Sequence, residues 1–228
     1  LTLDVDMIWN GGIGTFIKAS EEEHAAVGDR INDVLRVNAK DVRAKVIGEG
    51  GNLGCTQKGR IEYARHGGRI NTDAIDNSGG VDLSDHEVNL KILLAPLVAQ
   101  GTLSFNERNN LIREVAHDVC AKVVANNDAH ALLLSLDQLR SKKDALDFMR
   151  AANFLAEESA GIPTQEDFPT KGNLFSRGVQ YGLFRPELAK LLAYMKMYVY
   201  SELLKSDPLR FPDNDLLLHE YFPELVSK

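Results

Sequence analysis

Short apolar runs alternate with longer amphipathic stretches through the first third of the chain. These runs predict short strands at residues 5–9, 44–47 and 69–72, the first of them buried. Residues 21–37 carry apolar positions along one side behind Ser20, a residue that favours the N-cap position, and so predict a helix. Residues 56–66 predict a short polar helix. The order strand, helix, strand, helix, strand indicates parallel βαβ units.

The rest of the chain has the periodicity of helices. Residues 87–98 predict an apolar helix that Pro96 kinks or ends, and the pair Ser104 and Glu107 forms a capping box that opens the next helix. The inward positions predicted for that next helix are Leu111, Ile112, Val115, Val119 and Val123. Further helices are predicted at 128–140 and 145–157. The pattern therefore predicts an α/β region followed by an all-helical C-terminal region.

The last long helix is predicted to start near residue 185, with Pro186 in its first position. Its expected core stripe is Leu188, Leu191, Leu192, Met195, Val199 and Leu203. The stretch 164–180 before it is rich in proline and glycine. We expect that stretch to be a mobile connection or a lid.

A glycine-rich turn, residues 48–54, follows the second predicted strand. Its glycines surround Glu49 and Asn52 but do not match the dinucleotide fingerprint G-x-G-x-x-G, because Leu53 occupies the third glycine position. The turn is either a tight connection between a strand and a helix, or a place where both side chains bind a ligand. An asparagine amide offers a donor and an acceptor, as an amide-bearing ring such as nicotinamide requires. Open α/β sheets bind ligands at such strand ends.

A second turn, residues 76–80, contains Asn77 and leads towards Ser84. Asparagine before glycine is common in plain turns, so a ligand contact by Asn77 is one of two interpretations. Ser84 and Glu87 match a capping box, and the alternative is that the Ser84 hydroxyl binds a carboxylate at a helix N-terminus. Consecutive side chains on a helix cannot all reach one ion, so residues 85–87 predict no metal site.

Together, these segments resemble a known family. Residues 44–52 (AKVIGEGGN), 76–81 (DNSGGV) and the pair Ser84 and Glu87 resemble the end of the coenzyme domain of glutamate dehydrogenases. Two departures stand out: Gly51 replaces an alanine, and residues 53–55 (LGC) replace a Gly-Pro-Thr run. The segments in which the chain is similar to the large bacterial NAD-specific glutamate dehydrogenases are 9–15 (WNGGIGT) and 184–196 (FRPELAKLLAYMK).

The resemblance implies a fold, a cofactor and a reaction. Residues 1–100 would form the second half of a Rossmann-like NAD-binding domain with a parallel sheet, and residues 101–228 a helical domain. The parent enzyme would oxidatively deaminate L-glutamate to 2-oxoglutarate and ammonia with NAD. Ser84 would bind the substrate side-chain carboxylate, and the catalytic lysine and aspartate would lie upstream, outside this segment. The residues expected to bind the coenzyme are Asn10, Gly11, Glu49, Gly51, Asn52 and Asn77.

Composition narrows the possible partners and compartment. A net charge of -7 argues against nucleic acid as the main partner. No apolar run has the length of a membrane span, and Cys55 and Cys120 lack metal-ligand spacing, which suits free thiols in a reducing cytoplasm. Because Leu1 is not a methionine, we expect a piece of a longer protein. We expect the full-length protein to be a homo-oligomer, and the isolated segment, which holds at most half of a nucleotide-binding sheet, to be inactive.

Two alternatives stay open at this point. The segment could be a non-catalytic helical assembly or regulatory part of a large enzyme, with its glycine turns serving only as strand ends. It could also belong to a related amino-acid dehydrogenase that acts on another substrate. Ser84 argues mildly against an apolar substrate, because such a substrate needs no partner for a side-chain carboxylate.

Overall fold

The computed structural model describes residues 1–158, 168–206 and 214–227. Contacts divide the chain into two compact units. Unit 1 consists of Leu1–Asn77 with His130–Ser201, and unit 2 of Ser78–Ala129 with Glu202–Lys228. These units do not coincide with the expected domains 1–100 and 101–228. The units are defined by contacts alone, so the domain boundary at residue 100 stays a prediction. In the described part of the chain, no helix is long and apolar enough to cross a membrane.

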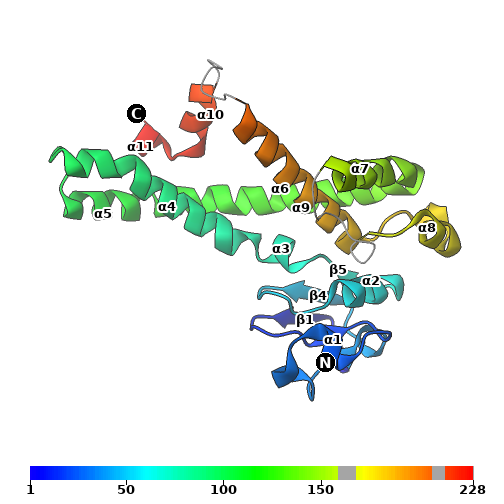
Figure 1. The fold of residues 1–228 in the computed structure, drawn as a ribbon. Coiled ribbons are helices and arrows are strands. Elements are labelled where there is room, and N and C mark those ends of the chain that lie inside the picture. Colours follow the sequence, from blue (N-terminus) through cyan, green and yellow to red (C-terminus); the bar gives the residue numbers. More distant parts are fainter. Residues whose placement is uncertain (159–167, 207–213, 228) are drawn as a thin grey trace. The chain divides into compact units, whose positions relative to one another are not determined.

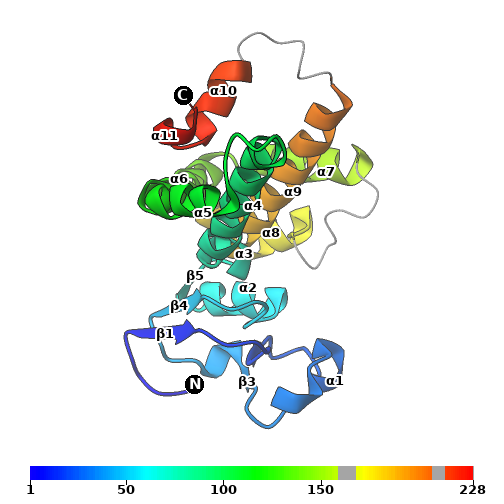
Figure 2. The same cartoon turned by 90° about the vertical axis from the view of Figure 1, so that its left-hand side faces the viewer.

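A small parallel sheet forms the first part of unit 1. Strands β1 (Met7–Asn10), β4 (Val46–Glu49) and β5 (Arg69–Ile70) pair in that order, and both pairings are parallel. Helix α2 (Gln57–Arg65) connects β4 to β5 and runs beside them in both views (Figures 1 and 2). The predicted βαβ unit is therefore confirmed for β4, α2 and β5, and β1 pairs parallel to β4 as expected. Strands β1 and β4 each begin two residues later than predicted.

The core of this sheet lies between the strands and α2. The Thr56 side chain caps α2 by accepting a hydrogen bond from the Gly59 N–H. Threonine is one of the residue types preferred at this N-cap position, which explains why the helix begins here. A second, two-stranded parallel sheet, β2 (Ile17–Lys18) with β3 (Val37–Asn38), adjoins it, and η2 (Ala39–Asp41) leads on towards β4. The buried residues of this core are Ile17, Ala39, Val42, Ala44, Ile47, Cys55, Tyr63 and Ile70.

The helix predicted at residues 21–37 is wrong. Only α1 (His24–Val27) is α-helical there, and it ends at Gly28, whose φ of 79° is left-handed; a short 3-10 turn, η1 (Arg30–Asn32), follows. Of the apolar residues that suggested an inward face, Val27 is half-buried and the others are exposed, among them Val34 at 91%.

Side chains replace the missing helical hydrogen bonds in this segment. The Asp29 carboxylate accepts from the Thr15 N–H at 2.8 Å, and the buried Arg36 side chain donates to the Thr15 carbonyl at 2.8 Å. The Ser20 hydroxyl does not cap a helix but donates to the Glu62 carboxylate at 2.6 Å. Such bonds between side chains and backbone compete with helix formation, which explains the difference from the prediction.

Helices form the second part of unit 1. They are the end of α6 (Ala116–Lys143), α7 (Ala145–Glu158), α8 (Lys171–Arg177), η3 (Val179–Tyr181) and most of α9 (Arg185–Lys205). Their shared core contains Leu134, Met149, Leu155, Leu174, Leu183 and Leu188. The prediction of α7 is confirmed. Of the expected loop 164–180, residues 164–167 lie outside the described residues, and α8 shows that the rest is partly helical.

The predicted core stripe of α9 holds only near its start. Leu188 and Leu191 are buried, and Leu192 and Met195 pack against the core from partly buried positions. Val199 is 45% exposed and Leu203 is 56% exposed, so for these two positions the prediction is wrong.

Unit 2 is helical. Helix α4 (Ser78–Ala99) packs on α5 (Phe105–Glu114), as Figure 1 shows, and the Ser104–Glu107 capping box is confirmed. The expected single helix is divided at Val115, which separates α5 from α6. Pro96 lies inside α4, which ends three residues later.

The core of unit 2 joins these helices to the C-terminal ones. Val115, Val119 and Val123 are buried as predicted. They form one core with Leu90 of α4 and with Phe222. Phe222 lies between the two last helices, α10 (Asn214–Tyr221) and α11 (Glu224–Ser227).

Candidate functional site

The carboxyl ends of the parallel strands bring most of the predicted coenzyme residues together. Asn10 pairs in register with Glu49, and the Gly51 N–H donates to the Asn10 carbonyl at 2.9 Å. Beyond β5, the Asn77 amide donates to Asn52 Oδ1 at 2.9 Å. Residues that are far apart in sequence thus form one edge, which is where open parallel sheets place ligands.

Two of the glycines at this edge are required by the packing of the turns. A Cβ on Gly51 would lie 2.2 Å from the Gly12 carbonyl oxygen, and a Cβ on Gly54 would lie 1.9 Å from Asn10 Nδ2. The turn after β1 and the turn after β4 therefore touch through their backbones. Asn10 Nδ2 is itself buried, and within the described residues it has no hydrogen-bond partner. A buried donor without a partner is uncommon and suits a ligand acceptor.

Trp9 occupies the face of the sheet next to this edge. A Cβ on Gly48 would lie 2.6 Å from the Trp9 ring, and a Cβ on Gly50 would lie 2.5 Å from it. Only glycine at these two positions leaves enough space for the indole. The side chain stays 59% exposed, and Met7 is 50% exposed. Ile8 packs against the core from a partly buried position, and no residue of the strand is buried, so the prediction that this first strand is buried is wrong.

Glu49 is enclosed at the end of β4. It is 0% exposed, and its carboxylate accepts hydrogen bonds from Arg60 Nε at 2.7 Å, from Arg60 Nη2 at 2.8 Å and from the Cys55 N–H at 3.0 Å. Burial raises the pKa of Glu49, and the hydrogen bonds and charge of Arg60 offset part of that rise. This geometry favours a carboxylate that holds the turn over one that contacts a ligand.

The pKa values of Arg60 and Cys55, the two hydrogen-bond partners of Glu49, are also shifted by burial and by the Glu49 charge. Burial would lower the pKa of Arg60, but the hydrogen bond and charge of Glu49 outweigh it, so the guanidinium pKa is raised and the group stays charged. The pKa of the Cys55 thiol is well above its ordinary value because of burial and the nearby Glu49 charge. Cys55 is therefore a packed thiol and not a nucleophile.

Two aspartates of α3 (Asp73–Asp76) hold the turns and were not predicted. Asp73 lies 3.1 Å from Arg60 Nη2 and accepts the Leu53 N–H at 2.8 Å, where Leu53 has a left-handed φ of 58°. Asp76 accepts the Glu49 N–H at 3.0 Å and the Asn71 amide at 2.8 Å. The available signal was that Asp73 directly follows the strand predicted at residues 69–72 and that Asp76 directly precedes Asn77.

Ser84 lies inside α4, not at its start. The helix begins at Ser78, and the Ser84 hydroxyl donates to the Val81 carbonyl at 3.1 Å. The expected capping box with Glu87 is wrong, because the Gly79-Gly80 pair, read as part of a turn, is helical. The argument from a helix N-terminus is therefore lost for Ser84, and its role towards a substrate carboxylate stays a prediction from the resemblance.

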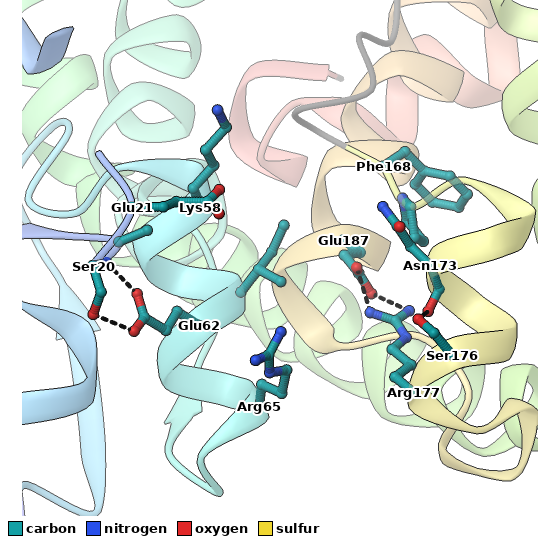
Figure 3. A pocket seen from close by; sticks show the side chains of 13 residues that line it. Ser20, Glu21, Lys58, Glu62, Arg65, Phe168, Asn173, Ser176, Arg177 and Glu187 are labelled. Carbon is teal, nitrogen blue, oxygen red and sulfur yellow. Dashed lines mark hydrogen bonds and ion pairs between the residues drawn. The ribbon is translucent and has the colours of Figure 1, made fainter. Parts of the chain in front are cut away.

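A pocket of about 510 Å³ lies elsewhere in unit 1, between α2 and α8 (Figure 3). In Figure 3, Glu62 is bonded to Ser20, and Arg177 faces Glu187. Those charges are paired within the protein, although Arg177 Nε has no hydrogen-bond partner among the described residues. The pocket contains none of the predicted site residues. We therefore place the candidate site at the strand ends.

Family models match most of the chain. The model described as bacterial NAD-glutamate dehydrogenase, catalytic domain, matches residues 1–137, and the model described as glutamate dehydrogenase, C-terminal, matches residues 180–228. The chain belongs to the bacterial NAD-glutamate dehydrogenase family. The resemblance found in the sequence is confirmed, and every predicted site residue falls within the match to the catalytic domain of that family.

Relatives in this glutamate dehydrogenase family resemble the chain along its whole length. It is 44% identical to the NAD-specific glutamate dehydrogenases of Pseudomonas aeruginosa and of Mycobacterium tuberculosis, and 40% identical to that of Halomonas elongata. Each match covers 100% of this chain and 14% of the length of the relative.

Proposed function

We propose that this chain is the segment of an NAD-dependent glutamate dehydrogenase that supplies coenzyme- and substrate-binding residues. The full-length enzyme would convert L-glutamate to 2-oxoglutarate and ammonia, with its catalytic lysine and aspartate outside this segment. The observation that carries the proposal is the meeting of Asn10, Asn52 and Asn77 at one edge of a parallel sheet in a member of this family.

The residues at this edge fit the nicotinamide end of NAD. Asn10 Nδ2 offers a buried donor without a partner among the described residues, and Asn52 and Asn77 present amides that both donate and accept. When bound, NAD accepts the hydride from the substrate. The chain's own part is to orient the ring and the substrate, with Glu49 and Arg60 holding the turn that carries Asn52.

The test is NAD reduction with glutamate by the full-length enzyme, with Ser84→Ala measured beside the wild type. We expect wild-type turnover and a rise in the KM for glutamate that exceeds the change in kcat, because a carboxylate contact exists in both the ground and the transition state. Ser84→Thr, which keeps a hydroxyl, is the matched control and should stay close to wild type.

The outcomes separate the proposal from its alternatives. Wild-type turnover with a different amino acid only would preserve the coenzyme edge and remove glutamate as the substrate. No turnover with any amino acid would overturn the enzymatic proposal in favour of an assembly role. An unchanged KM for glutamate in Ser84→Ala would remove Ser84 alone from the site.

A further inference from the structure

The start of α9 reaches the carboxyl end of β5 through a single arginine. Arg185 Nε donates to Asn71 Oδ1 at 2.7 Å, across 114 positions of sequence. Its other nitrogens donate to Ser135 Oγ at 3.0 Å and to the Ala131 carbonyl at 3.4 Å. Arg185 thus bridges α6 and the residue that directly follows β5.

Arg185 fixes the donor and acceptor roles of the hydrogen bonds from Asn71 to Asp76 and on to Glu49. A guanidinium has donors and no acceptor, so Asn71 must turn its oxygen towards Arg185 and its nitrogen towards Asp76. The Asn71 amide then donates to Asp76 Oδ1 at 2.8 Å, and Asp76 Oδ2 accepts the Glu49 N–H at 3.0 Å. This chain of bonds ends on the first peptide of the turn that carries Gly51 and Asn52.

The start of α9 does not depend on Arg185 for its own anchoring. Glu187 is bound by Arg177 and caps the Phe184 N–H at 2.8 Å. The Leu183 N–H donates to Ser141 Oγ at 3.0 Å, and the Gln57 amide donates to the Pro186 carbonyl at 3.0 Å. The contact with Asn71 is therefore additional to the bonds that hold this turn in place.

We propose that Arg185 is a positioning residue for coenzyme binding, acting through Asn71 and Asp76 on the Glu49–Asn52 turn. The inference rests on the proposed function, because the ligand of that turn would be NAD. Without Arg185, the Asn71 amide loses the partner that fixes its orientation and can turn its oxygen towards the Asp76 carboxylate. Asp76 would then hold the Glu49 peptide less firmly.

The test measures steady-state kinetics of the full-length enzyme with Arg185→Met. We expect the KM for NAD to rise about tenfold, the change produced by loss of one hydrogen bond to a charged group, with a smaller change in kcat. Arg185→Lys keeps one donor and should recover part of the affinity. Asn71→Leu should raise the KM for NAD similarly, and the double variant should show no further rise.

Ser141→Ala is the matched control, because it removes the hydrogen bond to the Leu183 N–H in the same turn, and Ser141 contacts neither Asn71 nor Arg60. It should leave the KM for NAD at the wild-type value, with thermal unfolding of every variant measured alongside. An Arg185→Met enzyme that loses thermal stability but keeps its KM for NAD would overturn the positioning role. Strictly additive effects of Arg185→Met and Asn71→Leu would also overturn it. Absence of turnover in the wild type would instead refute the proposed function.

Discussion

Two glutamates in unit 1 are enclosed by the protein in almost the same way. Glu49 is 0% exposed and Glu187 is 1% exposed, and each accepts two hydrogen bonds from one arginine. Each also accepts a backbone N–H from a neighbouring turn. A buried carboxylate needs such partners, because an unpaired charge in the protein interior is costly.

The surroundings of the two pairs differ. Arg60, the partner of Glu49, is 2% exposed and also contacts Asp73, so one cation is enclosed with two anions. Arg177, the partner of Glu187, is 13% exposed, and Glu187 lies in the first turn of α9, where the helix dipole favours a negative charge. The Glu49 cluster therefore depends more heavily on its arginine, and it supports a turn that would face the coenzyme.

The largest expected effect is on the Glu49 side. Arg60→Met should lower the free energy of unfolding by about 3–5 kcal/mol, since it leaves a buried carboxylate without its partner. Urea denaturation of the chain measures this loss. Arg140→Met, which changes an exposed arginine of α6, is the control and should alter stability little. A small loss in Arg60→Met would mean that Glu49 is already protonated in the wild type.

A smaller effect is expected at the helix start. Glu187→Gln keeps the shape and the capping acceptor but removes the charge, so we expect a loss of about 1–3 kcal/mol. In the full-length enzyme the KM for NAD should change less than in Arg60→Met, because Glu187 acts on the strand ends only through the start of α9, which keeps its bonds to Ser141 and Gln57. Equal losses of NAD affinity in Glu187→Gln and Arg60→Met would erase the distinction between the two pairs.

Local patterns in the sequence predicted the parts of the fold that depend on neighbouring residues. Apolar runs that end in glycine turns located the parallel strands, and the spacing of Ser104 and Glu107 located a capping box. The partners that hold the site were missed because they lie far away in sequence. Asp76 is 27 positions from Glu49, and no spacing rule of three or four residues connects them.

The wrong predictions have the same physical origin. Ser20 has the residue type of an N-cap, yet its hydroxyl bonds Glu62, 42 positions away. Val34 fits a helical stripe, yet it is exposed because Arg36 and Asp29 bind the backbone of Thr15 instead. Periodicity indicates where a helix would bury one apolar face. It does not show where distant polar side chains bind the backbone in place of the helical hydrogen bonds.

Alkaline pH gives the mildest test of how α2 holds β4. Arg60 anchors α2 to Glu49 at the carboxyl end of β4. At the other end, the Tyr63 hydroxyl donates to the carbonyl of Ala44, two residues before β4 begins, at 2.5 Å. Burial, with a contribution from Cys55, raises the pKa of Tyr63 to about 12. Because the unfolded value is about 10, the stability due to neutral Tyr63 is complete below pH 10 and is lost as the pH rises to 12.

By pH 12 this loss should amount to about 2 kcal/mol in the wild type, measured by urea denaturation across the range. Tyr63→Phe keeps the ring against Gly68 and removes the ionisable hydroxyl, so it should be less stable at neutral pH by about 1 kcal/mol. It should also lack that part of the alkaline decline. If the free energies of unfolding of the wild type and of Tyr63→Phe decline in parallel from pH 10 to 12, the pKa of Tyr63 is the same in the folded and the unfolded chain. Arg60 would then be the anchor of α2 that carries the measurable stability.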